Sequence, residues 1–544
     1  MKRFQITLLI LIIFTAFILR FYKLGINPPG LYWDEAVFGY DAYSILKTGK
    51  DHHGVTLPLF FESFGDWKLP GYHYLLVLSI AVFGLNEFAV RFPSAFFGSL
   101  TIIVFFFIVK KLTKNIRLSL FCTFFLAISP WHIQFSRAGF ESTVGLFFVT
   151  SAVYFFLFLI DDRKTKPRSA FFLPAIALAT AGLFTLSMYF YNAYRIFTPL
   201  FVISLLLIYL EVVKKIAAKL ILPALLALIL IFPIIIFTIS KEGRSRAISQ
   251  SAFSYAGFET NRIDYDQKSK KPLRFLSKYW YWPFYFSYLA FNTYIDHFSP
   301  SFLFFKGDQI GRHSQVDMGQ IYLFEGILLI VSIIAFKKLN AQTKKIMFSW
   351  LILAPIPAII VTPSPHAYRT LQIAIPLAFF SGFGAYLIFS QKKLLLVKII
   401  MIVIIGYSFL TYLHLLLIHY PKKFAADWQD GYKAMVAQVQ KYQDQFNKVY
   451  VTNINQVPYI YLLFYQKYDP QKFINSGGTR DAFDKYVFIS DDVNIYDKAL
   501  PAGWQGRILY VAPSWKKVDG NFLAAVDDSV GRHIYTLWEV NGQN

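Results

Sequence analysis

The acidic pair Asp34-Glu35 is the most informative feature of this chain. It lies in the segment Leu31-Tyr-Trp-Asp34-Glu35-Ala, just beyond the first apolar stretch of the sequence. Carboxylates this close to lipid are costly unless they are solvated or paired, so an ionisable pair here is a candidate functional site. A second acid, Glu141, directly precedes another apolar segment. If both acids face the same side of a membrane, the chain has a polar site on that face.

These acids have a chemistry that fits their place in the sequence. An acid such as Asp34, at the start of a loop, can act as a general base that takes a proton from an acceptor hydroxyl. Cations beside such a base indicate a developing negative charge, and a departing phosphate fits this arrangement. A phosphate needs no protonation, so one base with cations suffices, unlike the two-carboxylate arrangement used on glycosides. The candidate cations are Lys68, Arg137, Arg195, His366 and Arg369.

Each candidate residue also has a simpler interpretation. Asp34 could simply be the N-cap of a helix over residues 35–46, which would end at Gly49. The other candidates could be solvated first-turn acids, side chains that reach to lipid headgroups, or structural residues: Glu35, Glu141, Lys68, Arg137, His366 and Arg369.

A metal site is not indicated by the spacing of possible ligands. Four loop residues could join one, namely Asp66, His52, His53 and His313, but no ligand spacing supports it. Solvated loop residues are the simpler interpretation. No cofactor is therefore predicted, and the need for a divalent metal ion stays open with unknown ligands.

The composition indicates a membrane protein. Of the 544 residues, 56% are hydrophobic and 16% are charged, and the mean hydropathy is +0.45. Apolar runs of about 17–25 residues recur, which is the length that a helix needs to cross the hydrocarbon layer. The net charge of +22 does not indicate a nucleic-acid partner, because Lys and Arg stand at the ends of the apolar runs, where they meet anionic lipids. One cysteine, Cys122, excludes an internal disulfide.

The basic clusters between apolar runs set the predicted orientation. They lie at 110–117, 163–168, 214–215, 337–345 and 392–393. Placing all of them in the cytoplasm, together with the N-terminus, predicts a multi-pass protein of the plasma membrane with about eleven spans. The spans are expected near 5–21, 92–109, 117–131, 141–160, 170–187, 196–211, 218–239, 320–336, 346–362, 370–390 and 394–418. The apolar stretch 72–85 is too short to cross and is predicted to be a juxtamembrane or re-entrant helix.

This topology places the acids on one face. The predicted extracytoplasmic segments are the first loop 22–91 with its juxtamembrane helices, the turn 132–140, the long loop 240–319 and the tail. Asp34, Glu35 and Glu141 then share the extracytoplasmic side, and so do the segments around His366 and Arg195.

The tail has a different character from the rest of the chain. Short β-like runs such as 448–452 and 507–511 alternate with helical stretches and with glycine-containing turns. This alternation predicts a soluble extracytoplasmic α/β domain over residues 421–544, following a transmembrane catalytic domain over residues 1–420.

Several ordered motifs carry a family resemblance. They are Arg20-Phe-Tyr-Lys-Leu-Gly, Pro29-Gly-Leu-Tyr-Trp-Asp34-Glu35, Asp66-Trp-Lys68-Leu-Pro, Asn86-Glu-Phe-Ala-Val-Arg91-Phe-Pro and the stretch from Ser129-Pro-Trp-His to Glu141. In this order they resemble the membrane glycosyltransferases of the GT-C fold, nearest to bacterial protein O-mannosyltransferases and aminoarabinose transferases. The resemblance covers residues 1–420, and its best motifs precede residue 145.

The resemblance implies a polyprenyl-phosphate-sugar donor and an inverting transfer outside the cytoplasm, to a hydroxyl of a protein, lipid or glycan. It implies that Asp34 is the base or the acid that orients the acceptor, that Glu141 is the second acid, and that Lys68 contacts the donor phosphate. Some relatives carry an acid directly before this lysine, whereas Trp67 stands there in this chain. A metal site that used that acid is therefore in doubt, although Asp66 could replace it.

Two other functions are compatible with the sequence. A transporter or flippase of a lipid-linked glycan would carry charges or broken helices at the membrane midplane and a repeat between its halves. The acids here stand at segment ends and no repeat is evident, which favours the enzyme. A non-catalytic protein that binds the cell envelope through its tail is the second alternative.

Overall fold

The computed structural model describes residues 1–161, 172–243, 282–359, 363–454, 457–490 and 506–541. The chain forms two compact units. The first unit comprises residues 1–22, 64–71 and 94–414, and the second comprises residues 23–63, 72–93 and 415–544. The first loop predicted from the sequence is therefore divided between them.

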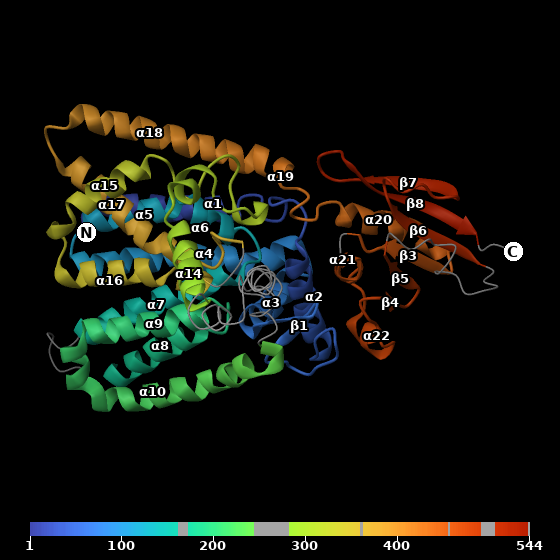
Figure 1. The fold of residues 1–544 in the computed structure, drawn as a ribbon, viewed down its shortest axis with the longest axis horizontal. Helices are drawn as coiled ribbons and strands as arrows, with labels where there is room; N and C mark the ends of the chain where they lie inside the picture. Colours follow the sequence, from blue (N-terminus) through green and yellow to red (C-terminus); the bar gives the residue numbers. More distant parts are fainter. Residues whose placement is uncertain (162–171, 244–281, 360–362, 455–456, 491–505, 542–544) are drawn as a thin grey trace, which may run out of the picture. The chain divides into compact units, whose positions relative to one another are not determined.

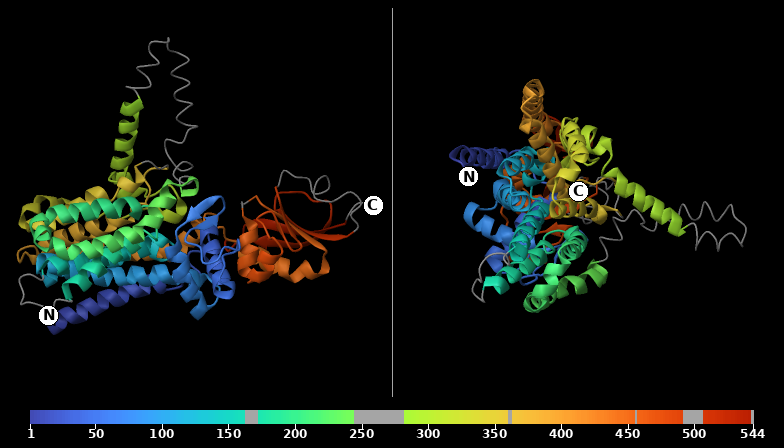
Figure 2. Two further views of the ribbon diagram at one scale, coloured as in Figure 1. Left: turned by 90° about the horizontal axis from the view of Figure 1, so that it is seen from below. Right: turned by 90° about the vertical axis from the view of Figure 1, so that its left-hand side faces the viewer.

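The first unit is a helical bundle whose long helices run side by side (Figure 1). Its helices are α1 (Arg3–Phe21), α5 (Ile116–Ile128), α6 (Pro130–Ser136), α7 (Glu141–Asp161), α8 (Phe172–Ser187), α9 (Tyr194–Ile208), α10 (Leu210–Ile239), α14 (Trp282–Asp296), α15 (Glu325–Ile334), α16 (Ala341–Leu353), α17 (Ala374–Ser390) and α18 (Leu395–His414). Helix α4 (Glu87–Thr113) contributes its residues from Ser94 onward to this unit. Helix α14 leaves the bundle at a steep angle (Figure 2).

Six helices among the described residues are long and apolar enough to cross a membrane, and the bent pair α5–α6 makes up to seven. Each predicted span overlaps a helix, but α8, α9, α15 and α16 have only 16, 15, 10 and 13 residues. At 1.5 Å per residue these four helices are shorter than a hydrocarbon layer of roughly 30 Å. The multi-pass character is thus confirmed, whereas the count of eleven stays a prediction.

One basic cluster lies in a different place from that predicted from the sequence. The cluster at 214–215, expected to lie in a loop, lies instead within α10, because a single break at Tyr209 separates α9 from α10. Strong helix formers around the lysines let the helix begin earlier than the charge pattern indicated. The cluster at 163–168 lies outside the described residues, as does the part of the predicted loop 240–319 from 244 to 281.

Close helix packing in the bundle depends on two glycines of α17. A Cβ atom at Gly382 would lie 2.4 Å from the Cα of Cys122 on α5, and one at Gly384 would lie 2.1 Å from the carbonyl oxygen of Leu328 on α15. Neither distance allows a side chain, so these glycines let α17 lie directly against both neighbours. Cys122 is fully buried at this contact, and its thiol donates to the carbonyl of Phe379 at 3.4 Å.

The second unit combines parts of the first loop with the C-terminal region. It contains α2 (Trp33–Thr48), β1 (Phe61–Ser63), most of α3 (Pro70–Phe83) and the first residues of α4. From the C-terminal region it contains the π-helix η8 (Leu415–His419), α19 (Tyr420–Lys423), α20 (Tyr432–Tyr442), α21 (Pro458–Tyr465), α22 (Pro470–Asn475) and a sheet. Helix α2 packs against α21 and α22. The C-terminal part of the second unit begins at Leu415, close to the predicted boundary near residue 420, and the unit also includes residues 23–63 and 72–93 of the first loop.

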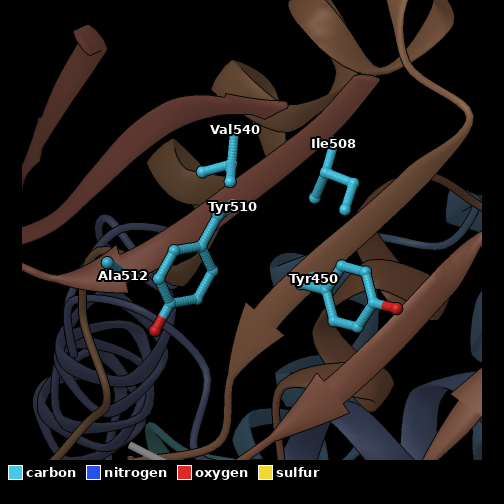
Figure 3. Close-up of a cluster of buried hydrophobic side chains, with 5 residues drawn as sticks. All are labelled: Tyr450, Ile508, Tyr510, Ala512 and Val540. Atoms are coloured by element: carbon cyan, nitrogen blue, oxygen red, sulfur yellow. The ribbon is translucent and has the colours of Figure 1, made fainter. Parts of the chain in front are cut away.

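The sheet has six strands in the order β4-β5-β3-β6-β8-β7. The strands are β3 (Lys448–Thr452), β4 (Ala482–Phe483), β5 (Tyr486–Ile489), β6 (Arg507–Pro513), β7 (Asn521–Asp527) and β8 (His533–Asn541). Strand β3 pairs in parallel with β5 and β6, and the outer pairs are antiparallel. Alternate residues of β6 share one face, where Ile508, Tyr510 and Ala512 pack with Tyr450 and Val540 (Figure 3). The mixed sheet agrees with the α/β character predicted for the tail.

Candidate functional site

Asp34 and Glu35 lie in the first turn of α2, in the second unit. Asp34 is half-buried and is the second residue of the helix. The residue at the N-cap position is Tyr32, whose backbone N–H donates to the Glu35 carboxylate at 3.2 Å. The expectation that Asp34 could cap a helix beginning at Glu35 therefore differs from the structure, because the helix begins earlier. Gly49 ends α2 with a φ of 73°, as expected for a left-handed cap.

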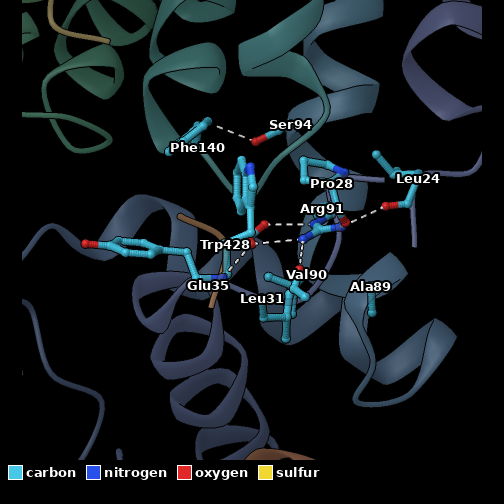
Figure 4. A network of polar contacts seen from close by, with 12 residues as sticks. Leu24, Pro28, Leu31, Glu35, Ala89, Val90, Arg91, Ser94, Phe140 and Trp428 are labelled. Atoms are coloured by element: carbon cyan, nitrogen blue, oxygen red, sulfur yellow. Dashed lines mark hydrogen bonds and ion pairs between the residues drawn. The ribbon is translucent and has the colours of Figure 1, made fainter. Parts of the chain in front are cut away.

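Glu35 is held by a buried arginine. The Nε and one Nη atom of Arg91 donate to the two carboxylate oxygens of Glu35 at 2.9 and 3.1 Å, and the side chains are 0% and 2% exposed (Figure 4). Such a bidentate pair fixes both groups geometrically. Because both oxygens of Glu35 are engaged, this carboxylate is suited to positioning α2 rather than to accepting a proton from a substrate.

The same guanidinium also shapes the loop before Asp34. Arg91 donates to the carbonyls of Leu24, Pro28 and Gly30, the first two at 3.2 and 2.7 Å, and it stacks 5.6 Å from the ring of Trp428. Arginine has five N–H donors, and these contacts direct them to two carboxylate and three carbonyl oxygens. The contacts therefore fix the chain that leads into α2, and with it the place of Asp34 within the second unit.

The C-terminal region also contacts this loop. Gly30 has a φ of +62°, and a Cβ atom there would lie 2.8 Å from the carbonyl oxygen of Trp428. The backbone N–H of Trp33 donates to the Gln429 side chain at 2.9 Å, and the hydroxyl of Tyr461 donates to the carbonyl of Leu31 at 3.0 Å. The region after residue 420 thus helps to position Asp34.

Glu141 is the first residue of α7 in the first unit and is buried. The hydroxyl of Tyr368 donates to its carboxylate at 2.5 Å. The tyrosine ring packs against Tyr191, Phe140 and Phe135, with ring centroids 4.3, 4.7 and 5.4 Å away. A carboxylate at a helix N-terminus is stabilised by the helix dipole. The aromatic rings of Tyr368, Phe140 and Phe135 make the surroundings of this carboxylate apolar. Burial and the nearby Glu141 charge raise the pKa of Tyr368 well above its ordinary value.

Two predicted cations of the first unit have well-defined partners. The guanidinium of Arg137 is buried and donates to the carbonyls of Leu19 and Tyr22 at 2.7 and 2.8 Å, at the end of α1. This geometry favours a structural role, in which the arginine satisfies carbonyls that a helix end leaves without intrahelical partners. Arg195 donates to the Thr238 hydroxyl at 3.3 Å and stacks on Phe237.

Lys68 lies in β2 (Asp66–Lys68) of the first unit. Its side chain is only 7% exposed, and its ammonium is 3.6 Å from the carboxylate of Asp66. A lysine so well buried is costly without an anionic partner. The Asp66–Lys68 spacing on one strand places both side chains on the same face, as the period of two residues requires.

His366 and Arg369 stand on the same turn as Tyr368. His366 is buried, and its backbone N–H donates to the Nε2 atom of His297 at 3.0 Å. One nitrogen of His366, one of His313 and a carboxylate oxygen of Asp308 lie within 4.8 Å of one another, and all three residues are buried. Arg369 is half-buried.

The segment 308–313 is tied to this turn by Asp308. Its carboxylate accepts from the backbone N–H of Ile310 at 2.8 Å and from that of Ala367 at 2.6 Å. The Nδ1 atom of His313 is 3.5 Å from the same carboxylate. Burial lowers the pKa of His313, the Asp308 carboxylate partly offsets this, and the charges of two nearby arginines lower the pKa further.

His52 and His53, which were considered for a metal site without support from ligand spacing, lie in the second unit. His52 binds the buried Asp41 carboxylate at 2.5 Å, and His73 is 3.7 Å from its other oxygen. Burial alone would raise the pKa of Asp41, but these histidines lower it below its ordinary value. His53 pairs with Glu62 at 2.7 Å. These residues form polar pairs with one another within the first loop.

The structure therefore groups the predicted residues into two sets. Within the first unit it brings Glu141 together with the turn that carries His366 and Arg369, through Tyr368. Asp34 and Glu35 belong to the other unit, so their convergence with Glu141 stays a prediction. Sequence reasoning missed Tyr368, Asp308 and the pairing of Arg91. Arg91 lay in a noted motif, but a contact across 56 positions leaves no local signal.

Comparison with known proteins agrees with the resemblance seen in the sequence. Residues 10–242 match the family described as dolichyl-phosphate-mannose-protein mannosyltransferase. An uncharacterized protein of Aquifex aeolicus (strain VF5) is 25% identical over 164 residues, which are 30% of this chain and 31% of that protein. The match thus spans less than a third of the length of this relative.

Solved structures extend the likeness to the whole chain. ArnT from Cupriavidus metallidurans in the apo state gives a TM-score of 0.56 at 11% identity, and the same protein bound to undecaprenyl phosphate gives 0.55 at 12%. Both alignments cover 97% of each chain. The oligosaccharyltransferase of Archaeoglobus fulgidus in the apo form gives 0.50 at 13%, over 85% of this chain and 64% of that one. At such identities the likeness establishes the fold. The predicted resemblance to GT-C glycosyltransferases is confirmed by the family match and by this fold.

Proposed function

We propose that this protein transfers a sugar from a polyprenyl-phosphate carrier to an acceptor hydroxyl on the extracytoplasmic side of the plasma membrane. The observation that carries the proposal is the family match over residues 10–242, because this segment contains Asp34, Lys68 and Glu141. The ArnT structure with bound undecaprenyl phosphate supports a polyprenyl carrier. The distribution of basic residues supports the orientation.

The reaction is an inverting single displacement. The acceptor oxygen attacks the anomeric carbon and its proton passes to the Asp34 carboxylate, while the bond from the anomeric carbon to the phosphate oxygen breaks. The phosphate leaves with the bonding electron pair and needs no proton. General-base catalysis of this kind contributes about 10²–10⁴-fold to a rate. Glu35 and Arg91 hold the helix that carries the base.

The first unit contains the residues assigned to the donor, and it also contains the second acid, Glu141. Lys68 and Arg369 are assigned to the donor phosphate, because a cation stabilises the charge that develops on a departing phosphate. Glu141 is assigned to orienting the acceptor or the sugar, with its carboxylate held by Tyr368. Arg137 is assigned to positioning α1 rather than to the phosphate, on the basis of its two carbonyl contacts. The acceptor is a hydroxyl of a protein, lipid or glycan.

The proposal is tested by reconstituting the full chain in vesicles with a panel of polyprenyl-phosphate sugars and analysing the acceptors by mass spectrometry. We expect transfer by the parent protein, and for Asp34→Asn a loss of about 10²–10⁴-fold with donor binding kept. Asp444→Asn is the matched control, since Asp444 is 86% exposed in the C-terminal region. Transfer by Asp34→Asn at the parent rate would remove the catalytic assignment. Absence of transfer from every polyprenyl donor would remove the function.

A further inference from the structure

A buried group of two histidines and one aspartate lies beside the Tyr368–Glu141 contact. Asp308, His313 and His366 are 5%, 6% and 7% exposed, and each offers one ligand atom within 4.8 Å of the others. They come from two segments, the stretch leading into the short 3-10 helix η4 (Gly311–His313) and the turn after residue 362. Buried polar atoms need partners, so three buried ligand-type groups this close together require an explanation.

The separations fit a single small metal ion. Two ligands on a tetrahedral ion with bonds of about 2.1 Å are about 3.4 Å apart. The Nδ1 atom of His313 and the Oδ2 atom of Asp308 are 3.5 Å apart. The Nδ1 atom of His313 makes no hydrogen bond in the structure, and 3.5 Å is too long for a strong one to the carboxylate. The third ligand atom lies within 4.8 Å of the other two, so it needs to move inward by at most about 1.4 Å to complete the set.

The surroundings of these residues resemble a supported metal site. The Asp308 carboxylate is oriented by the backbone N–H groups of Ile310 and Ala367. His297 holds the backbone of His366, and its own Nδ1 atom binds the carbonyl of Thr293 at 2.7 Å. Partners of this kind orient metal ligands and are part of most metal sites. The group is therefore fixed on both segments before any ion binds.

We propose that Asp308, His313 and His366 bind one Zn²⁺ ion. Two imidazoles and one carboxylate are a donor set that zinc prefers, with a fourth position left for water or another ligand. The ion fixes the turn that carries His366 against the segment 308–313. Because Tyr368 lies two residues further along that turn, the ion also steadies the ring that holds Glu141. The inference does not depend on the proposed function, since metal binding is measured without any sugar donor.

The test is the zinc content of the full chain, purified in detergent with any histidine tag removed. The protein is stripped with a chelator, reloaded with ZnSO₄ alone, desalted and analysed by mass spectrometry of the elements. We expect one zinc ion per parent chain. For Asp308→Asn, His313→Asn and His366→Gln we expect affinity to fall by more than the roughly 10–100-fold that loss of an outer partner costs. His533→Gln is the matched control, because His533 and Asp527 form an exposed pair 2.5 Å apart.

Two readouts separate a metal site from a hydrogen-bonded cluster. Zinc should raise the melting temperature of the parent and of His533→Gln, but not that of the three ligand variants, because a ligand of the folded state stabilises it. A parent chain that keeps no stoichiometric zinc would overturn the proposal, and so would equal zinc in His313→Asn and His533→Gln. Size-exclusion profiles identify variants that fail to fold, and the parent measurement decides the question even then.

Discussion

Arg91 holds Glu35 through two hydrogen bonds, 2.9 and 3.1 Å long, between side chains that are essentially inaccessible to solvent. The two residues are 56 positions apart and come from α4 and α2. A buried charge is tolerated only when it is paired and hydrogen-bonded, and this arginine also binds three carbonyls of the loop before α2. The pair therefore links the acid next to Asp34 to the backbone that positions it.

Breaking this pair should destabilise the protein strongly. Glu35→Gln leaves the Arg91 charge buried without its counter-ion, and such a change costs about 3–5 kcal/mol. The measurement is the free energy of unfolding in mixed micelles. Glu539→Gln is the control, because its pair with Arg507 has side chains 16% and 53% exposed, and such pairs contribute below about 1 kcal/mol. Equal losses of unfolding free energy in the two variants would show that the Glu35–Arg91 pair stabilises the protein no more than an exposed pair does.

Tyr368→Phe should slow transfer without unfolding the protein. The change removes the hydroxyl that donates to Glu141 and keeps the ring that packs on Tyr191. A hydrogen bond to a charged group contributes about 1.5–3 kcal/mol, so the rate should fall by roughly 10–100-fold. The measurement is the single-turnover rate at saturating donor. Tyr386→Phe removes a comparable hydroxyl, which accepts from Asn115, and should leave the rate unchanged.

Lys68 should act on donor binding. Lys68→Ala removes the charge assigned to the phosphate, and we expect roughly 10–100-fold weaker binding of a polyprenyl phosphate. Lys68→Arg should recover part of the loss, since it keeps the charge but changes its geometry. Binding is measured with the carrier lipid alone. Lys214→Ala is the control, because that side chain is 62% exposed. Parent-like binding by Lys68→Ala would contradict the assignment.

The contribution of His53 to stability should depend on pH. Partial burial alone would lower the pKa of His53, but the hydrogen bond and charge of Glu62 raise it above its ordinary value. The pair is therefore fully stabilising below the unfolded pKa of about 6.5, and this contribution is lost as the pH rises through the higher folded pKa. His53→Gln should lower the melting temperature more at about pH 5.5 than at about pH 9. A difference that grows with pH would contradict the sign of this shift.

The sequence predicted the helical framework well, for a physical reason. A continuous apolar run in lipid must form a helix, so the places of α1, α7 and α17 follow from composition. Helix ends follow less well, because they depend on individual contacts. Helix α15 begins at Glu325, whose carboxylate accepts from the backbone N–H of Tyr322 at 3.1 Å and from the Ser381 hydroxyl at 2.6 Å. The second contact comes from a distant helix and has no local signature.

The candidate site was predictable only in part. Asp34, Lys68 and Glu141 stood out because charged residues are rare beside apolar segments and because their order resembles a family. The partner of Glu141 did not stand out, since Tyr368 is one of 35 tyrosines. His313 and His366 were noted separately, but their approach to Asp308 depends on two turns whose geometry the residue types do not encode.

The burial of Cys122 between α5 and α17 makes this chain a convenient background for mapping membrane sidedness. The parent has no other thiol, and this one is fully enclosed, so an impermeant maleimide should leave folded vesicle-bound protein unmodified. A cysteine introduced for Trp33 or for Phe140 would then be the sole reporter of where its loop emerges. Labelling of both from the same compartment is what the shared-face hypothesis requires.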